Sequence, residues 1–473
     1  MTILVLTNIG SRDVTHNRQN ISPARSKGEE LLENYSNIAK DLSFPIIQPV
    51  LTYLQNQHPH EEIHLYLFGT DQPDPAFQPT DTLYFSRLIA RRLPEIMGEN
   101  IKTRVVDVKV NPAYYDSTYD HYNDLLIDIL KDEKNTETCY VALAGGTPAC
   151  NTALLLHGVR LFGDRLQVIY TPQGGEPIPI RAGKQILDTF REAVAIERLE
   201  RLDFANVLPL LEEIQCPDGI RYLVKYSAHR LDFDFRSAQK ELEDAISHSD
   251  DETRNFIQSD LRHDLDALLN ESQSPAKLVA LLRELNWNAA ICWQHRRYAD
   301  FLARVYRFQE AVLRYLVEEF FNLPTDLSPR AKENTIQRWE EGIPAIPGLL
   351  DYLGGKSLDW HNNGRMTHKA LLSFALQPDV NILPDKQHNL LESLVKQVNG
   401  LDRLVELRHR TIVGHDFEGV SEASLLEASP KNQPPPNMLN EIVQKIEVVE
   451  NSSHRDNPYE KIARFACQKL RKD

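Results

Sequence analysis

Apolar and polar residues follow two different rhythms along this chain of 473 residues. In the first 185 residues, short apolar runs rich in β-branched side chains alternate with segments of helical spacing. The expected strands are residues 2–9, 62–69, 102–110, 138–144 and 166–171, and the helical patterns between them include 28–42, 81–97, 119–130 and 148–161. This alternation predicts a Rossmann-like α/β domain, in which a mostly parallel sheet carries helices on both faces.

From about residue 184 onward the pattern is helical. Residues 186–285 carry dense charges of alternating sign, which are typical of solvated helix faces, so we expect a helical connector without chemistry of its own. Residues 286–473 predict an all-α C-terminal domain. Its amphipathic run after Trp287 repeats apolar side chains at helical spacing, which indicates a core helix. These apolar positions are Phe301, Val305, Phe308, Val312 and Leu316.

Two further segments of the C-terminal domain have simple expectations. Residues 421–437 contain three consecutive prolines, Pro434, Pro435 and Pro436, and predict a surface loop. A helix from about Pro458 is expected to complete the domain. The sequence therefore predicts three domains, with boundaries at 1–185, 186–285 and 286–473.

The stretch 401–417 combines a helical pattern with an unexpected arginine and histidine. Its apolar residues Leu401, Leu404, Val405, Ile412 and Val413 predict one buried helix face. On an unbroken helix, Arg408 lies on this face and His415 points only about 20° away from it, whereas Arg410 points about 140° away from His415. Such a pair is either a buried polar network or a phosphate-cleaving site. If Gly414 ends the helix, the angular argument weakens and Arg410 becomes a contender.

Two turns at the carboxyl ends of predicted strands are candidate binding sites, because Rossmann-like sheets bind ligands at that edge. The first turn, residues 7–13, follows the first strand. The second contains Gly145 and Gly146, which permit a tight turn, then Thr147 as a helix cap and Pro148 at the first helical position. Amide groups that converge at a helix start attract phosphate. A turn that binds nothing would carry the same glycines, and a third loop, 172–175, could close over this edge.

The second turn matches neither of two familiar nucleotide motifs. No Gly-Lys-Ser/Thr follows, so it is not a P-loop, and the G-x-G-x-x-G spacing of a dinucleotide fingerprint is missing. A metabolic Rossmann enzyme is therefore disfavoured.

Charge and composition narrow the function classes further. The net charge of −15 argues against a protein that coats nucleic acid, but the part from Leu285 onward is nearly neutral, with 24 Lys plus Arg against 25 Asp plus Glu, and can approach RNA transiently. No apolar run approaches the length of a membrane span, and the start lacks a basic leader, so we expect a cytoplasmic protein without membrane contact. The five cysteines lack paired spacing and are expected to be core thiols rather than metal ligands.

The sequence resembles one known family at both ends. The GGTP turn within residues 144–151, after a central strand, resembles the CARF sensor domains of type III CRISPR systems. Residues 303–310 (ARVYRFQE) and 406–415 (ELRHRTIVGH) resemble the HEPN ribonuclease domain that follows CARF in those effectors. HEPN motifs usually carry a polar residue directly after the arginine, a place that His409 fits, although the family's spacing allows Arg408 or Arg410.

The resemblance implies a metal-independent endoribonuclease that a cyclic oligoadenylate activates. In this interpretation, Arg408 stabilises the phosphoryl oxygens and His415 is general acid or base. His409 either positions RNA or is purely structural, and Arg410 is the alternative arginine. A tetra- or hexa-adenylate ring has a two-fold axis, so the expected assembly is a homodimer. The resemblance also implies single-stranded RNA as the substrate, and not DNA. The ring contacts carried over by motif position are Thr7, Asn8, Gly145, Gly146, Thr147 and Asn151, with no cofactor or metal.

Two other readings remain open from the sequence. Some relatives also cut the ring slowly in the CARF domain, for which Asn8 and Thr147 are the expected participants. The rival function is a non-catalytic nucleotide sensor joined to a helical dimerisation or interaction module. In that case Arg408 and His415 are a buried polar pair.

Overall fold

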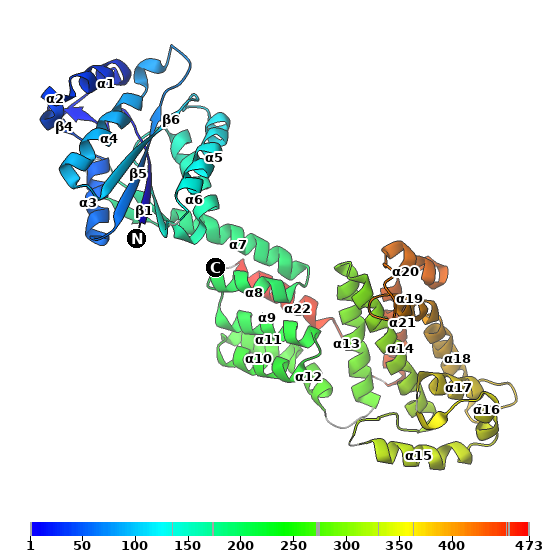
Figure 1. Ribbon diagram of the computed structural model, residues 1–473. Coiled ribbons are helices and arrows are strands. Elements are labelled where there is room, and N and C mark those ends of the chain that lie inside the picture. The colour runs from blue at the N-terminus through cyan, green and yellow to red at the C-terminus, as the bar shows by residue number, and fades with distance from the viewer. Residues whose placement is uncertain are drawn as a thin grey trace. The chain divides into compact units, whose positions relative to one another are not determined.

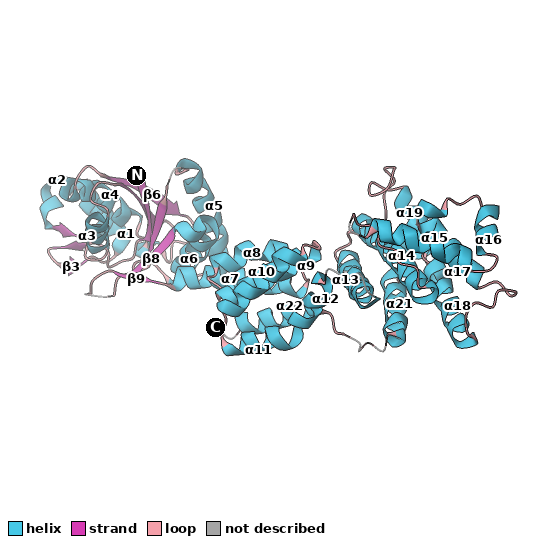
Figure 2. Ribbon diagram, turned by 90° about the horizontal axis from the view of Figure 1, so that it is seen from below, coloured by secondary structure: helices cyan, strands magenta, loops and turns pink. Residues whose placement is uncertain are grey.

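The computed structural model describes residues 2–134, 136–172, 175–270, 275–329, 331–362, 364–450, 452 and 455–471. The chain forms two compact units, Met1–Arg191 and Glu192–Asp473. All strands among the described residues lie in the first unit, and the second is helical (Figure 2). An α/β domain followed by an all-α region is the fold class that the sequence predicts, whereas the division into three domains stays a prediction.

A six-stranded sheet with the order β6-β5-β1-β7-β8-β9 forms the centre of the first unit. Neighbouring strands are parallel except β8 and β9, which are antiparallel. The chain extends the sheet in one direction from β1 and then in the other from β7, so the reversal lies between these two strands. In open α/β sheets, such a reversal opens a crevice at the carboxyl ends of the strands. The strand bounds are β1 (Thr2–Asn8), β5 (Glu62–Thr70), β6 (Ile101–Val108), β7 (Thr138–Ala142), β8 (Leu166–Tyr170) and β9 (Ile178–Ile180).

Both faces of the sheet are covered by helices, as Figure 1 shows. Successive side chains of β1 point to opposite faces, so Ile3 and Val5 pack with α3 (Ile47–Gln57) and α4 (Leu83–Met97). Leu4 and Leu6 instead pack with α5 (Tyr115–Asp132) and α6 (Pro148–Phe162). A strand that is buried on both faces has a continuous apolar run, as β1 and β5 have. All five predicted strands are confirmed.

The sequence predicts one helix over residues 28–42, but the segment between β1 and α3 is built differently. Helix α1 (Ala24–Glu33) starts earlier and stops at Asn34, whose side-chain amide donates to the backbone oxygen of Glu30 at 3.0 Å. Asparagine competes with helical hydrogen bonds in this way. A short helix and a three-stranded sheet, both missed, complete the region: α2 (Tyr35–Ile38), β2 (Thr15–His16), β3 (Gln19–Asn20) and β4 (Leu42–Ser43).

The second unit contains two hydrophobic cores. The first is built from α8 to α12, the end of α7 and the closing helix α22, and the second from α13 to α21. The five apolar residues of α14 that are predicted to face the core of the domain are all 0 % exposed, which confirms that prediction. The helices are α7 (Ala182–Glu200), α8 (Phe204–Glu213), α9 (Asp218–Leu231), α10 (Phe235–Ser247), α11 (Asp251–Asp260), α12 (Arg262–Leu269), α13 (Pro275–Gln294), α14 (Tyr298–Phe321), α15 (Lys332–Ala345), α16 (Leu349–Gly355), α17 (Arg365–Ala375), α18 (Asp385–Asn399), α19 (Asp402–His409), α20 (Glu422–Ala428), α21 (Pro435–Val449) and α22 (Pro458–Leu470).

The closing helix α22 packs in the first of these cores rather than with α14 to α21. Its Tyr459 is fully buried, and the hydroxyl group donates to Glu284. The same carboxylate accepts from the buried guanidinium of Arg230 at 2.7 and 3.0 Å. A buried ion pair such as Arg230–Glu284 needs further hydrogen bonds, and Tyr459 supplies one. This bond holds α22 beside α9 and α13.

The predicted surface loop at residues 421–437 is wrong. Ser421 and Ser424 form a capping box that starts α20, whose Leu425 is fully buried. The proline run does not prevent a helix, because a helix tolerates proline in its first turn, where the missing amide has no intrahelical acceptor. Helix α21 accordingly begins at Pro435.

All five cysteines are buried and free, which confirms them as core thiols. Within the described part of the chain, no helix is both long enough and apolar enough to cross a membrane.

Candidate functional site

The carboxyl ends of β1 and β7 are joined by a relay of side-chain hydrogen bonds. Tyr122 donates its hydroxyl hydrogen to the amide oxygen of Asn8 at 2.5 Å, and the Asn8 amide donates to the side-chain oxygen of Asn151 at 2.8 Å. Asn151 in turn donates to the backbone oxygen of Gly145 at 2.9 Å. Asn8 is 1 % exposed, so this relay lies beneath the turn and holds it in place.

The two glycines of the turn permit a close approach that no other residue allows. A Cβ atom on Gly145 would lie 2.3 Å from the backbone oxygen of Asn8. Gly146 has a φ of +79°, and a Cβ there would lie 2.6 Å from the Cβ of Asn8. Thr147 follows as the cap of α6, accepting from the Cys150 amide at 3.3 Å, while its hydroxyl group donates to the backbone oxygen of Pro112.

A cavity of about 580 Å³ opens at this edge of the sheet. Of the six predicted ring contacts, Gly146 and Thr147 line the cavity. The other four do not line it: Thr7, Asn8, Gly145 and Asn151. Thr7 and Asn8 are 3 % and 1 % exposed and support the turn from below. The binding role of all six stays a prediction, as does ring cleavage by Asn8 and Thr147. Gln173 and Gly174 of the third loop lie outside the described residues.

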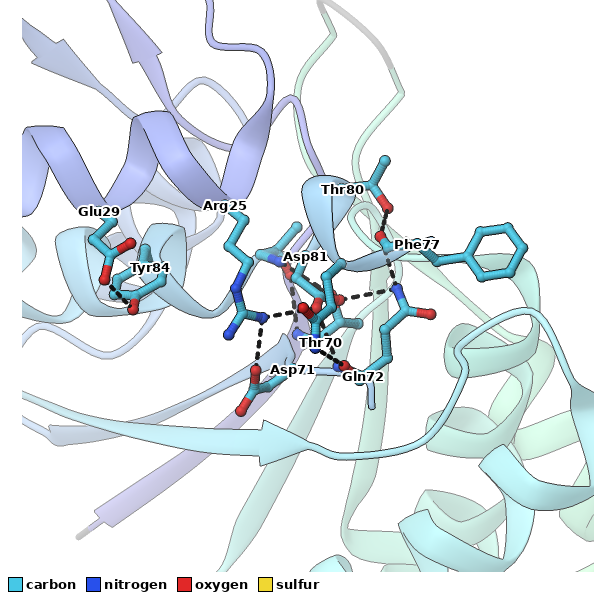
Figure 3. A network of polar contacts seen from close by, with 11 residues as sticks. Arg25, Glu29, Thr70, Asp71, Gln72, Phe77, Thr80, Asp81 and Tyr84 are labelled. Atoms are coloured by element: carbon cyan, nitrogen blue, oxygen red, sulfur yellow. Dashed lines mark hydrogen bonds and ion pairs between the residues drawn. The ribbon is translucent and has the colours of Figure 1, made fainter. Parts of the chain in front are cut away.

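One wall of the cavity is fixed by a polar network that the sequence analysis missed (Figure 3). Asp81 is fully buried and accepts from Arg25 at 3.0 Å, from the Gln72 backbone amide at 3.1 Å and from the Gln72 side chain at 3.0 Å. Arg25 also bonds Asp71 at 2.7 Å. These contacts hold the segment that contributes Thr80 and Thr82 to the cavity lining. The residues lie in three separate stretches of sequence, so no local motif marks them.

Asp13 gives this site a pH dependence. Its carboxylate accepts from the Gly10 amide at 2.5 Å, and burial raises the pKa of Asp13 from 3.8 to about 7, against the lowering effect of that hydrogen bond. The folded state therefore retains a proton that the unfolded chain loses above about pH 4. Stability of the first unit is fully present below that pH and falls as pH rises to about 7, by on the order of 4 kcal/mol.

We expect Asp13→Asn to remove this dependence, because the neutral amide keeps an acceptor for Gly10 without a buried charge. Hydrogen exchange of the 2–20 segment, compared between the two proteins at each pH, measures the effect. At pH 8 the segment should exchange more slowly in Asp13→Asn than in the native protein, and at pH 4 the two proteins should exchange at the same rate. Equal protection at both pH values would contradict the assignment.

In the second unit, α19 ends at His409, so the helix does not extend to His415. The prediction of one continuous helix face from Leu401 to His415 is therefore wrong, and Ile412, expected to be buried, is 73 % exposed. The chain turns back instead: the His415 amide donates to the backbone oxygen of His409 at 2.9 Å. A Cβ atom on Gly414 would lie 2.3 Å from the backbone oxygen of Arg408, so only glycine permits this return.

The return brings three of the four predicted catalytic residues together. The rings of His409 and His415 stack with 5.8 Å between centroids and 12° between planes. Tyr306 of α14 meets His409 edge-on at 6.1 Å, and the guanidinium carbon of Arg408 lies 4.8 Å from the Tyr306 ring centroid. Burial and then the positive charges of Arg408, His415 and Arg365 lower the pKa of His409.

Arg410 does not join this cluster. It is exposed and pairs with Glu418 at 3.3 Å. The turn at Gly414 places Arg408, not Arg410, beside the stacked histidines, and the choice of catalytic arginine stays a prediction.

Asp402, at the start of α19, anchors the cluster to the neighbouring helices. It accepts from Lys369 at 2.6 Å, from Arg365 at 3.0 Å and from the buried Gln309 at 2.8 Å. Burial alone would raise the pKa of Asp402, but these three donors hold it below its ordinary value. Tyr306 lies inside the ARVYRFQE segment, whose family resemblance does not mark it as a site residue, and Arg365 has no sequence signal.

The cluster offers cationic and proton-transferring groups. Among the residues whose placement is described, no group of three His, Cys, Asp or Glu side chains is arranged to hold a metal ion. Tyr306 contacts His409, Arg365 and Arg408, and His415 stacks on His409. These imidazoles and guanidiniums suit the binding and cleavage of a phosphodiester.

Comparison with solved structures finds a full-length likeness in fold. Enterococcus italicus Csm6 bound to cyclic hexa-2′-fluoro-hexa-dAMP aligns over 99 % of this chain and 99 % of its own, with a TM-score of 0.56 and 12 % sequence identity. The likeness confirms the expected fold class, in which an α/β unit precedes a helical region. No model of a protein family and no curated protein matches the sequence.

Proposed function

From this likeness in fold and the Arg408–His409–His415 cluster, we propose that the chain is a single-stranded RNA endoribonuclease of type III CRISPR defence, activated by a cyclic oligoadenylate. The observation that carries the proposal is the return of the chain at Gly414, which stacks His415 on His409 beside Arg408. The solved Csm6 of this fold is bound to a cyclic analogue of six adenine nucleotides. Cyclic hexa-adenylate is therefore the first activator to test, followed by cyclic tetra-adenylate.

The mechanism uses the nucleophile that RNA already contains, the 2′-hydroxyl group beside each phosphate. His415 transfers a proton as general acid or base, since imidazole titrates near neutral pH. Arg408 presents its guanidinium to the phosphoryl oxygens and stabilises the charge that develops on them. The 2′-oxygen bonds to phosphorus as the 5′-oxygen leaves, which gives a 2′,3′-cyclic phosphate and a 5′-hydroxyl end.

In-line displacement needs one group to remove a proton and another to supply one, and a symmetric dimer provides two copies of His415. Ile412 and Phe417, which flank His415, are 73 % and 87 % exposed. Large apolar side chains so exposed beside a site mark a contact surface. We propose that a second copy of the chain covers them, and that ring binding to the paired first units aligns the two histidines.

This dimer predicts the effect of charge at Phe417. Phe417→Asp should convert the protein from dimer to monomer and lower RNA cleavage by roughly 100-fold or more, because a buried carboxylate without a partner costs several kcal/mol. Sedimentation measures the first effect and a fluorescent RNA assay the second. Val448→Asp, at a side chain on α21 that is 78 % exposed, is the matched control and should remain a dimer. A monomeric Phe417→Asp protein that still cuts at the native rate would refute the composite site.

The proposal as a whole is tested with fluorescent single-stranded RNA in EDTA, with and without rings of each size. Cleavage that requires a ring is expected, and no cleavage with any ring would reject the enzyme. The non-catalytic sensor is the remaining rival. It predicts ring binding without cleavage, and a His415→Ala variant that changes only in stability.

A further inference from the structure

A second groove lies beside the histidine cluster, between α14, α17 and the segment before α17. It encloses about 400 Å³, and its lining includes Tyr306, Arg365, Met366, Asp359 and His409. Met366 is 62 % exposed and offers an apolar surface within the groove. The groove shares His409 with the cluster described above, so a molecule in the groove is adjacent to the stacked imidazoles.

Charges of both signs border the groove. The guanidinium carbons of Arg365 and Arg408 lie 6.0 and 4.8 Å from the Tyr306 ring centroid. Both cations, with His415, contribute to the lowered pKa of His409, after burial, and Glu406 opposes them. Among the described residues, the Nε–H groups of Arg365 and Arg408 are buried and have no hydrogen-bond acceptor.

The carboxylates that border the groove are already engaged. Asp402 binds Arg365 but also Lys369 and Gln309, so it does not neutralise Arg365 alone. Asp359 accepts from the His361 backbone amide at 3.2 Å. An anion in the groove therefore meets Arg365, a lining cation whose partner Asp402 is shared with Lys369 and Gln309.

We propose that this groove binds the nucleotide next to the cleaved phosphodiester of single-stranded RNA. The base packs against Met366 and Tyr306, and the phosphate binds Arg365. A volume near 400 Å³ lies within the range of roughly 300–1,000 Å³ of small-ligand sites and suits one unstacked nucleotide, not a duplex. The inference rests on the proposed ribonuclease function, and it makes Arg365 a binding residue and not a catalytic one.

The first test separates binding from chemistry. Arg365→Ala should raise the RNA concentration for half-maximal cleavage about 10-fold and leave the maximal rate within about 3-fold, since one phosphate contact is lost. Asp402 keeps Lys369 and Gln309 as partners, so α19 stays in place. As a control, Arg403→Ala removes an exposed arginine from α19. It should change neither the half-maximal RNA concentration nor the maximal rate. A fall in maximal rate alone, or no change, would overturn the subsite.

The second test charges the groove wall without touching an ion pair. Met366→Glu should raise the half-maximal RNA concentration about 10-fold through repulsion of the phosphates. Leu350→Glu, at a side chain that is 46 % exposed and does not line the groove, is the control. Equal effects of the two substitutions would show a general charge effect and contradict the groove.

Binding measurements distinguish failure of this inference from failure of the enzyme. If the protein cuts no RNA, anisotropy of a labelled single strand still reports on the groove. Weaker binding in Arg365→Ala than in Arg403→Ala supports the groove, whereas a protein that binds no RNA overturns it.

Discussion

Arg408→Ala should lower ring-activated RNA cleavage by roughly 10²–10³-fold, because it removes the cation that stabilises the developing phosphoryl charge. Arg410→Ala, two residues away, should retain activity within about 3-fold of the native protein. The structural reason is the different surroundings of the two arginines. Arg408 lies over Tyr306 in the histidine cluster, whereas Arg410 is exposed and pairs with Glu418.

The two variants are matched in charge, residue type and segment, so their difference isolates the site. Single-turnover cleavage at saturating ring gives the comparison, and unchanged thermal unfolding excludes a loss of folded protein. If Arg410→Ala loses cleavage activity while Arg408→Ala keeps full activity, the catalytic arginine is Arg410 and the assignment to Arg408 is wrong.

Gly146→Ala should raise the ring concentration for half-activation by roughly 10²-fold, because a shift of the turn by even 1 Å misplaces the ligand contacts. The added Cβ would lie 2.6 Å from the Cβ of Asn8 at a φ of +79°. The maximal cleavage rate at saturating ring should stay near native, since the histidine cluster lies in the other unit. Titration of cleavage against ring concentration separates the two quantities.

Gly163→Ala is the control for backbone strain. Gly163 also has a positive φ, of +53°, but a Cβ there meets nothing within 4 Å. If Gly163→Ala shifts half-activation as far as Gly146→Ala does, strain in the unit and not the turn itself explains the result. An unchanged response in Gly146→Ala would remove the turn from the activator site.

The sheet could be predicted from sequence because its central strands are buried on both faces. Their apolar runs are continuous and need no knowledge of neighbours, as in Leu4 and Val5 of β1. Strand β9 escaped because its three residues, with Pro179 in the middle, lie at the sheet edge and lack that pattern. Helix α21 escaped because prolines that punctuate a loop can also start a helix.

The apolar spacing of residues 401–413 predicts one helix through Gly414, whereas α19 ends at His409 and Ile412 is exposed. Gly414 marks a possible helix end in the sequence, but its packing against the backbone oxygens of Arg408 and His409 depends on the path of the chain. Arg365 and Tyr306 come from other helices, so their approach to Arg408 depends on packing that no local pattern records.

The central claim is that Arg408 and His415 promote attack by the 2′-hydroxyl group of RNA. Mass spectrometry of the fragments formed in EDTA with cyclic hexa-adenylate or cyclic tetra-adenylate tests it most directly. We expect 2′,3′-cyclic phosphate and 5′-hydroxyl ends, and no cut at a nucleotide that lacks the 2′-hydroxyl. Fragments with 5′-phosphate and 3′-hydroxyl ends, or cutting of the 2′-deoxy position, would contradict the mechanism.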